Sequence, residues 1–193
     1  MSHSSQDEKS AKKEIQRMPK SDHNAAHYFI ETHLEAGRGD AIAFIEAASG
    51  KRISYGTLSA NSSKVAGALT KTGIKREERA AILMLDSIDY VEVFWGCLKA
   101  GVIAVPINTL LAGAVYDTIL SDSRASCLFV SAALLQVVKP VLAKNDHIRK
   151  VIVVGDHPLE NGFESYQTFT KGAPEQAAVA VSPDETAFWL YSS

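Results

Sequence analysis

Short apolar runs alternate with segments of helical length through the middle of the chain, and this alternation constrains the fold more than any other feature. The apolar runs are RAAILML, VIAVPI, ASCLFVS and KVIVVG, at 79–85, 102–107, 125–131 and 150–155. Buried strands that alternate with helices of about 10–15 residues are typical of βαβ units, whose right-handed crossovers build parallel sheets. The sequence therefore predicts an α/β fold: a mostly parallel sheet with helices on both faces.

The segments between these runs have the periodicity of amphipathic helices. In DSIDYVEVFWGCLKAG, Asp86 or Ser87 is expected to cap a helix that ends at Gly101. Its expected buried stripe is Ile88, Val91, Phe94, Trp95 and Leu98. A second helix over 112–124 is expected to bury Val115, Ile119 and Leu120. A third, over 132–145, contains Pro140, which is expected to kink or divide it.

The region before the first buried run has a different pattern. We expect a polar, mobile tail at 1–22, followed by an α/β unit over 23–193. The run 24–39 predicts a helix with Ala26, Phe29, Ile30 and His33 on one face. Residues 40–58 predict a short hairpin that turns at Ser49 and Gly50. Thr57 is then expected to cap or open a helix that ends at Gly73. Its expected buried residues are Leu58, Val65, Ala68 and Leu69.

The C-terminal part of the sequence is less regular. Residues 156–185 favour loops with one short helix around 163–169. The last run, TAFWLYSS at 186–193, predicts a closing strand that ends in two serines.

Composition excludes several classes of protein. A formal net charge of −2 offers no electrostatic reason to expect nucleic acid or an anionic membrane as a partner. No run approaches the ~18 apolar residues of a membrane span, and the polar start lacks the apolar core of a secretory signal. Cys97 and Cys127 lie in apolar runs and are expected to be buried free thiols in a reducing compartment. We therefore expect a cytoplasmic protein.

No assembled active site is visible in the residue pattern. His23 and His27 are four residues apart, but no third ligand lies at a metal-binding spacing, so no metal site is expected. The acidic pairs Asp86/Asp89 and Asp117/Asp122 are interpreted as caps and solvent-facing residues rather than acid–base machinery. The run KREER at 75–79 is interpreted as a solvated loop, and Phe94 and Trp95 are interpreted as core residues. The motifs GxSxG, HExxH, GxGxxG and a complete GxxxxGK[ST] do not occur.

Three stretches, in order, resemble the adenylate-forming ligases, a family that includes acyl-CoA and aryl-CoA synthetases, luciferases and peptide-synthetase adenylation domains. ISYGTLSANSSKVAGAL at 53–69 is similar to the family's [ST]Y-x-x-L entry, and GCLKAGVIAVPINTLL at 96–111 to its LKAGxxxVPxxP segment. DETAFWLYSS at 184–193 resembles the start of its phosphate-binding motif, YTSGSTGxPKG. Thr109, in place of a common proline, and FWLYSS are most similar to benzoate-CoA ligases and related aryl-CoA ligases.

The resemblance implies an N-terminal subdomain of an enzyme that uses ATP, Mg²⁺ and coenzyme A to convert a small aromatic carboxylate into its thioester. Tyr191, Ser192 and Ser193 match Y-[TS]-S, and the two serines would begin the ATP phosphate loop in an intact enzyme. The glycines, lysines and magnesium-binding glutamate of the family have no counterpart here. We therefore expect an inactive fragment with no catalytic residues of its own, which binds none of these ligands tightly and self-associates through its exposed subdomain face.

Two alternatives remain open at the level of sequence. One is another adenylate-forming enzyme, such as a fatty acyl-CoA ligase or a carrier-protein adenylating enzyme. The other is a non-catalytic α/β interaction module.

Overall fold

The computed structural model describes residues 23–158 and 162–191. The tail predicted at 1–22 lies outside the described residues. The elements in chain order are the π-helical segment η2 (His27–Glu31), α2 (Thr32–Glu35), β1 (Ile42–Ile45), β2 (Arg52–Ser54), α3 (Tyr55–Lys71), β3 (Arg79–Leu83), α4 (Ile88–Ala100), β4 (Ile103–Pro106), α5 (Gly113–Ser123), β5 (Cys127–Ser131), the 3₁₀ turn η3 (Ala132–Leu134), α6 (Leu135–Leu142), β6 (Lys150–Val154), β7 (Phe163–Ser165) and α7 (Tyr166–Thr170).

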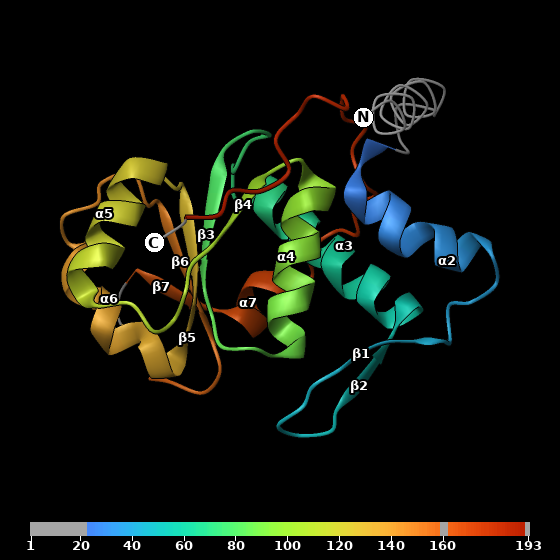
Figure 1. The fold of residues 1–193 in the computed structure, drawn as a ribbon, viewed down its shortest axis with the longest axis horizontal. Coiled ribbons are helices and arrows are strands. Elements are labelled where there is room, and N and C mark those ends of the chain that lie inside the picture. The colour runs from blue at the N-terminus through green and yellow to red at the C-terminus, as the bar shows by residue number, and fades with distance from the viewer. Residues whose placement is uncertain (1–22, 159–161, 192–193) are drawn as a thin grey trace, which may run out of the picture.

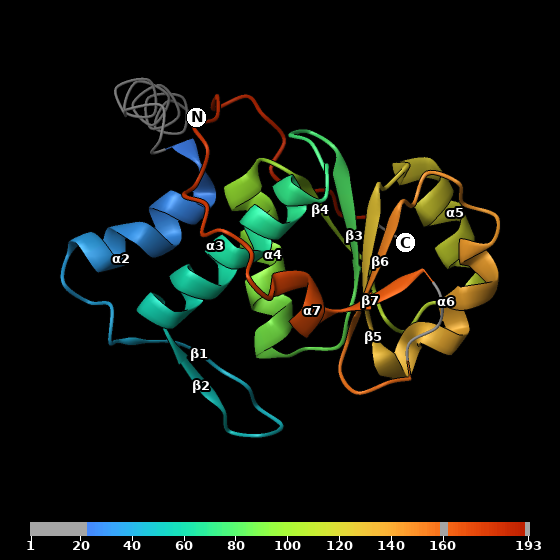
Figure 2. The same cartoon turned by 180° about the vertical axis from the view of Figure 1, so that it is seen from behind.

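A parallel five-stranded sheet in the order β4-β3-β5-β6-β7 forms the centre of the molecule. Helices α3, α4 and α7 lie on one side of it and α5 and α6 on the other (Figures 1 and 2). The hairpin β1-β2 is a separate antiparallel pair that projects beyond α3 (Figure 1). The predicted α/β fold and the predicted hairpin are both confirmed.

The apolar strands supply both faces of the core because their side chains alternate. Ala80 and Ile82 of β3 pack in the cluster under α3 and α4, whereas Ala81 and Leu83 pack in the cluster under α5 and α6. Strand β5 divides its residues in the same way, and all five of them are buried. Continuous apolar runs are therefore the sequence signature of strands covered on both faces.

The caps of the two long helices are serines. The Ser87 hydroxyl accepts a hydrogen bond from the Tyr90 N–H, which selects Ser87 over Asp86. The Ser54 hydroxyl accepts one from the Thr57 N–H, so α3 begins two residues before the predicted Thr57. Gly101 ends α4 with φ of +70°, as predicted.

The buried faces of the helices differ in part from the predicted stripes. In α4 the fully buried positions include Val93 and Cys97, while Val91, Phe94 and Trp95 are half-buried. In α5, Tyr116 is 1% exposed and Val115 is 40% exposed, because the helix turns the tyrosine rather than the valine toward β4 and β5. The predicted Ile119 and Leu120 are buried.

Three further expectations need correction. Phe29 is 55% exposed, although Ala26 and Ile30 of the same helix are buried. Pro140 lies inside α6 without ending it; the division of that segment comes earlier, between η3 and α6. The region 163–169 contains a strand, β7, before its short helix, and β7 pairs with the edge of β6.

The closing strand is also only partly formed. In place of a regular strand over 186–193, a single parallel bridge joins Phe188 to Ala104 of β4. Ser192 and Ser193 lie outside the described residues.

Cys97 and Cys127 are buried and free, as predicted. Burial raises the pKa of the Cys127 thiol to about 12, so it packs as a small apolar group. In the described ranges, no helix combines the length and apolarity that a membrane crossing needs.

Candidate active-site edge

The sheet order places a topological switch between β3 and β5, since β4 extends the sheet from one side of β3 while β5 to β7 extend it from the other. Ligands of open α/β sheets bind beyond the carboxyl ends of strands at such a point. There the Leu85 N–H donates to the Ser131 hydroxyl, at 2.9 Å, and links the ends of β3 and β5. The side chains of Leu85 and Leu110 at this edge are 46% and 91% exposed. The edge therefore exposes two leucines beside the exposed polar residues Asp86 and Asn108, and the Ser131 hydroxyl is already paired.

Residues 185–191, which we call the approach segment, run beside β4 toward this edge. The Trp189 N–H donates to the Ala104 carbonyl at 2.9 Å, and the Ala104 N–H donates to the Ala187 carbonyl at 3.3 Å. Because the bridge is parallel, the segment has the direction of β4 and leads toward its carboxyl end (Figure 1). In the sequence, Ser192 and Ser193 follow it directly.

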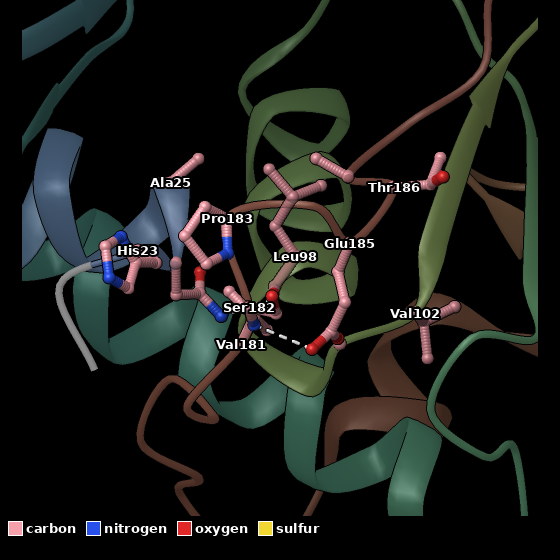
Figure 3. Close-up of a pocket in the computed structure, with 12 residues that line it drawn as sticks. His23, Ala25, Leu98, Val102, Val181, Ser182, Pro183, Glu185 and Thr186 are labelled. Carbon is pink, nitrogen blue, oxygen red and sulfur yellow. Dashed lines mark hydrogen bonds between the residues drawn. The ribbon is translucent and has the colours of Figure 1, made fainter. Parts of the chain in front are cut away.

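A pocket of about 190 Å³ lies behind the start of the approach segment, between the chain at 23–25, the end of α4 and residues 181–187 (Figure 3). The Ser182 N–H donates to the Glu185 carboxylate at 2.7 Å, and Arg76 pairs with the same carboxylate. The hydrogen bond from Arg76 is the main cause that lowers the pKa of Glu185. The pocket is lined by Gly101 and Val102, at the amino end of β4. The pocket therefore lies at the opposite end of the strands from the switch point, and the charge of its Glu185 carboxylate is already paired with Arg76.

Two buried polar networks fasten the helices together. Lys99 is 1% exposed; its ammonium donates to the Ser59 and Ser63 hydroxyls at 3.0 and 2.8 Å and pairs with Glu31. Burial lowers the pKa of Lys99, and the hydrogen bond to Glu31 opposes that shift. All fully buried side-chain polar atoms in the described ranges have a partner. The Lys99 network is therefore structural rather than a reactive site.

The second network centres on Glu92, which is 5% exposed. Its carboxylate accepts from the Tyr166 hydroxyl at 2.8 Å and from the Asn61 amide at 2.7 Å. Burial raises the pKa of Glu92 and raises the pKa of Tyr166 well above its usual value. The network joins α4, α3 and α7 on one side of the sheet, so it too is structural.

The histidines and acidic pairs singled out in the sequence have identifiable neighbours in the fold, and Asp89 is half-buried rather than solvent-facing. His33 stacks on Tyr55, with ring centroids 3.8 Å apart, and the His27 ring lies 3.8 Å from the Glu35 carboxylate. Asp117 accepts from the Asn145 amide at 3.2 Å. Across residues 23–158 and 162–191, no three His, Cys, Asp or Glu side chains come together as a metal site would require.

Sequence reasoning missed several roles, and one of its interpretations was incomplete. Within KREER, Arg76 and Glu78 have ion-pair partners, Glu185 and Arg149, rather than only solvent. Asp122, interpreted as a helix-end residue, accepts a hydrogen bond from the Tyr191 hydroxyl. These partners are 69 or more positions away in the chain, so no local pattern signals them.

Comparison with known proteins shows which protein family the chain belongs to. The family model of the AMP-binding enzymes matches residues 31–193. The chain therefore belongs to the AMP-binding enzyme family, as the three sequence motifs indicated.

Particular relatives are aryl-CoA ligases. The chain is 36% identical over 179 residues to a 4-hydroxybenzoate-CoA/benzoate-CoA ligase of Rhodopseudomonas palustris, covering 91% of this chain and 32% of that protein. It is 34% identical over 173 residues to a benzoate-CoA ligase of Thauera aromatica, covering 89% and 32%. The chain thus spans about a third of the length of the curated relatives it matches.

Solved structures of two aromatic-acid CoA ligases are also similar to this chain. The anthranilate CoA ligase AuaEII, in complex with anthranoyl-AMP, superposes with a TM-score of 0.82 at 28% identity, covering 91% of this chain and 34% of that one. A benzoate CoA ligase from Burkholderia xenovorans LB400 superposes with a TM-score of 0.76 at 32% identity, covering 87% and 32%.

Proposed function

We propose that this chain is the N-terminal part of an ATP-dependent, AMP-forming ligase that joins an aromatic carboxylate to coenzyme A. The observation that carries the proposal is the similarity over nearly the whole described chain to ligases named for benzoate, hydroxybenzoates and anthranilate. Residues 23–193 then form the N-terminal α/β subdomain. Two buried thiols suit a reducing compartment, and we expect the ligase to act in the cytoplasm.

The proposed reaction has two steps. A carboxylate oxygen attacks the α-phosphorus of ATP, and the bond to the bridging oxygen breaks to release pyrophosphate. The coenzyme A sulfur then attacks the carbonyl carbon of the acyl-adenylate, and the bond to the AMP oxygen breaks. Both steps require donors around crowded negative charge, which preorganised hydroxyls and N–H groups supply.

In this scheme the hydroxyls of Ser192 and Ser193 donate hydrogen bonds to the ATP phosphates, and the approach segment leads directly into these two serines. Mg²⁺ would enter with the nucleotide and neutralise phosphate charge. The described residues contain no acidic cluster that could hold that ion. The remaining groups of the site would come from the longer protein.

Reading the gene beyond the codon for Ser193 is the first test. An in-frame continuation similar to GSTGxPKG supports the ligase, whereas a stop codon favours the interaction module or a truncated gene. Thermal-shift screening of the full-length product then separates the substrate classes. Benzoate and hydroxybenzoates should raise its melting temperature with Mg·ATP present, and medium-chain fatty acids should not; the reverse ranking would assign it to the fatty acyl branch.

A further inference from the structure

The approach segment has little backbone support of its own. Among the described residues 185–191, only Trp189 and Ala187 form backbone hydrogen bonds with β4, and both bonds are to Ala104. Phe188 and Leu190 are 45% and 69% exposed. A strand held by one bridge is free to shift in register unless side chains fix it.

On the α4 side, two contacts restrain the start of the segment. Glu185 pairs with Arg76 of the loop before β3. Phe188 packs edge-on against Phe94 of α4, with centroids 5.7 Å apart. These contacts fix where the segment begins.

On the α5 side, two further contacts restrain its end. The Arg79 guanidinium lies 5.7 Å from the centroid of the Trp189 ring. The Tyr191 hydroxyl donates to the Asp122 carboxylate at 2.7 Å. Phe188 on one side and Trp189 and Tyr191 on the other follow the alternation of an extended chain, so all the contacts are compatible with one strand geometry.

The partners on the α5 side are themselves held in place. Arg79 donates from Nε to the Ser123 carbonyl at 2.8 Å and from a terminal nitrogen to the Arg124 carbonyl at 3.3 Å. Asp122 belongs to the same last turn of α5. Trp189 and Tyr191 are thus both tied to the carboxyl end of α5. Burial and the hydrogen bond to Asp122 raise the pKa of Tyr191 to about 12, so the phenol keeps its proton at physiological pH.

We propose that Arg79 and Asp122 are positioning residues for the ATP phosphate loop: by holding Trp189 and Tyr191, they set the direction and register of the chain that leads into Ser192 and Ser193. Neither residue contacts the nucleotide in this scheme. The inference rests on the proposed function for the role of the serines, while the anchoring itself is a property of this chain.

Hydrogen–deuterium exchange of residues 1–193 tests the anchoring without any ligand. Asp122→Ala should speed amide exchange of the peptide that contains 185–191 by several-fold and leave β3 and β5 unchanged. Asp122→Asn should largely restore protection, since an amide oxygen still accepts from Tyr191. Asp146→Asn, at an exposed aspartate between α6 and β6, is the matched control and should behave as wild type.

The Trp189 indole gives an independent spectroscopic readout. The chain has two tryptophans, so Trp189→Phe assigns the Trp189 resonance in a ¹⁵N spectrum. Asp122→Ala and Arg79→Lys should shift this resonance and lower its heteronuclear NOE, while that of Trp95 stays fixed. Unchanged exchange over 185–191 together with an unchanged indole signal in Asp122→Ala would overturn the proposal.

The functional consequence is measured in the longer ligase. Asp122→Ala should raise the KM for Mg·ATP by about tenfold with a smaller effect on kcat, since small displacements of binding groups are costly. Asp122→Asn should restore it. An Asp122→Ala enzyme with wild-type KM overturns the positioning role, whereas absence of turnover in the wild-type ligase refutes the proposed function and leaves the exchange result standing.

Discussion

At the scale of single residues, Gly67 lies where α3 meets the extended chain at Pro174. A Cβ at position 67 would lie 2.9 Å from the Pro174 carbonyl carbon and closer still to its oxygen. Backbone cannot move aside as a flexible side chain would, so Gly67→Ala should destabilise the fold by about 2 kcal/mol or more despite the better helix propensity of alanine. Urea unfolding followed by circular dichroism measures this.

Gly113, the first residue of α5, is the matched control. A methyl group added at this position would have the Val137 carbonyl oxygen as its nearest neighbour, at 3.9 Å, which is an ordinary contact. Gly113→Ala should be neutral or stabilising by up to about 1 kcal/mol. Equal losses in both variants would contradict the close packing at Gly67.

Glu92 makes stability depend on pH. Burial raises its pKa above the ordinary 4.5, so the folded state binds more protons than the unfolded state just above that pH. The contribution of Glu92 to the free energy of unfolding is full below pH 4.5 and is lost as the pH rises through the folded pKa. A tenfold difference in proton affinity between the two states corresponds to about 1.4 kcal/mol. Asp89, whose pKa burial also raises, adds in the same direction.

As the pH rises from about 5 to about 8, the free energy of unfolding measured by urea titration should therefore fall less for Glu92→Gln than for wild type. A glutamine can still accept from one of the partners Asn61 and Tyr166, so the fold should be kept. Glu92→Ala leaves both partners unpaired and should cost about 1–3 kcal/mol at every pH. Parallel pH profiles for wild type and Glu92→Gln would contradict the burial account.

Buried charges mark the limit of sequence reasoning at this scale. The sequence predicted the burial of Leu58 and Val65 because their spacing is apolar and periodic. It did not predict that Glu92 and Lys99 are buried, since their partners Tyr166 and Glu31 come from elements far along the chain. Local patterns treat such charges as solvent-facing.

At the scale of elements, Lys99 joins α4 to η2 and α3 through contacts to Glu31, Ser59 and Ser63. Lys99→Met leaves a carboxylate and two hydroxyls without their cation and should cost about 3–5 kcal/mol. Proteolysis should then cut first in the segment around η2, which has lost its tie to α3 and α4. Lys71→Met, at an exposed lysine near the end of α3, is the control and should change stability by less than about 0.5 kcal/mol. Equal stabilities of the two variants would contradict the role of this network.

Element identity was more predictable than element detail. The apolar runs predicted β3 to β6 because a strand buried on both faces needs continuous apolar residues. The strand β7 was missed because it has three half-buried residues at a sheet edge, too few for a pattern. The predicted closing strand is present only as the single bridge at Phe188. Side-chain contacts hold this segment beside β4, and no local sequence pattern predicts such contacts.

At the scale of the whole molecule, apolar surface remains uncovered. The hairpin exposes Ile42, Phe44 and Ile45 at 47%, 40% and 57%, and Phe29 adds to the exposed apolar area. We expect residues 1–193 to self-associate with rising concentration, and Ile45→Lys to reduce it. Light scattering over a concentration series measures this; a clean monomer at high concentration would contradict the expectation.

Pyrophosphate release tests the central claim most directly. The full-length protein, supplied with Mg·ATP, coenzyme A and benzoate or a hydroxybenzoate, should release pyrophosphate and form AMP in an acid-dependent manner. Residues 1–193 alone should give no more than the buffer blank. Acid-independent or absent release by the full-length protein across a panel of aromatic acids, or turnover by residues 1–193 alone, would contradict the account.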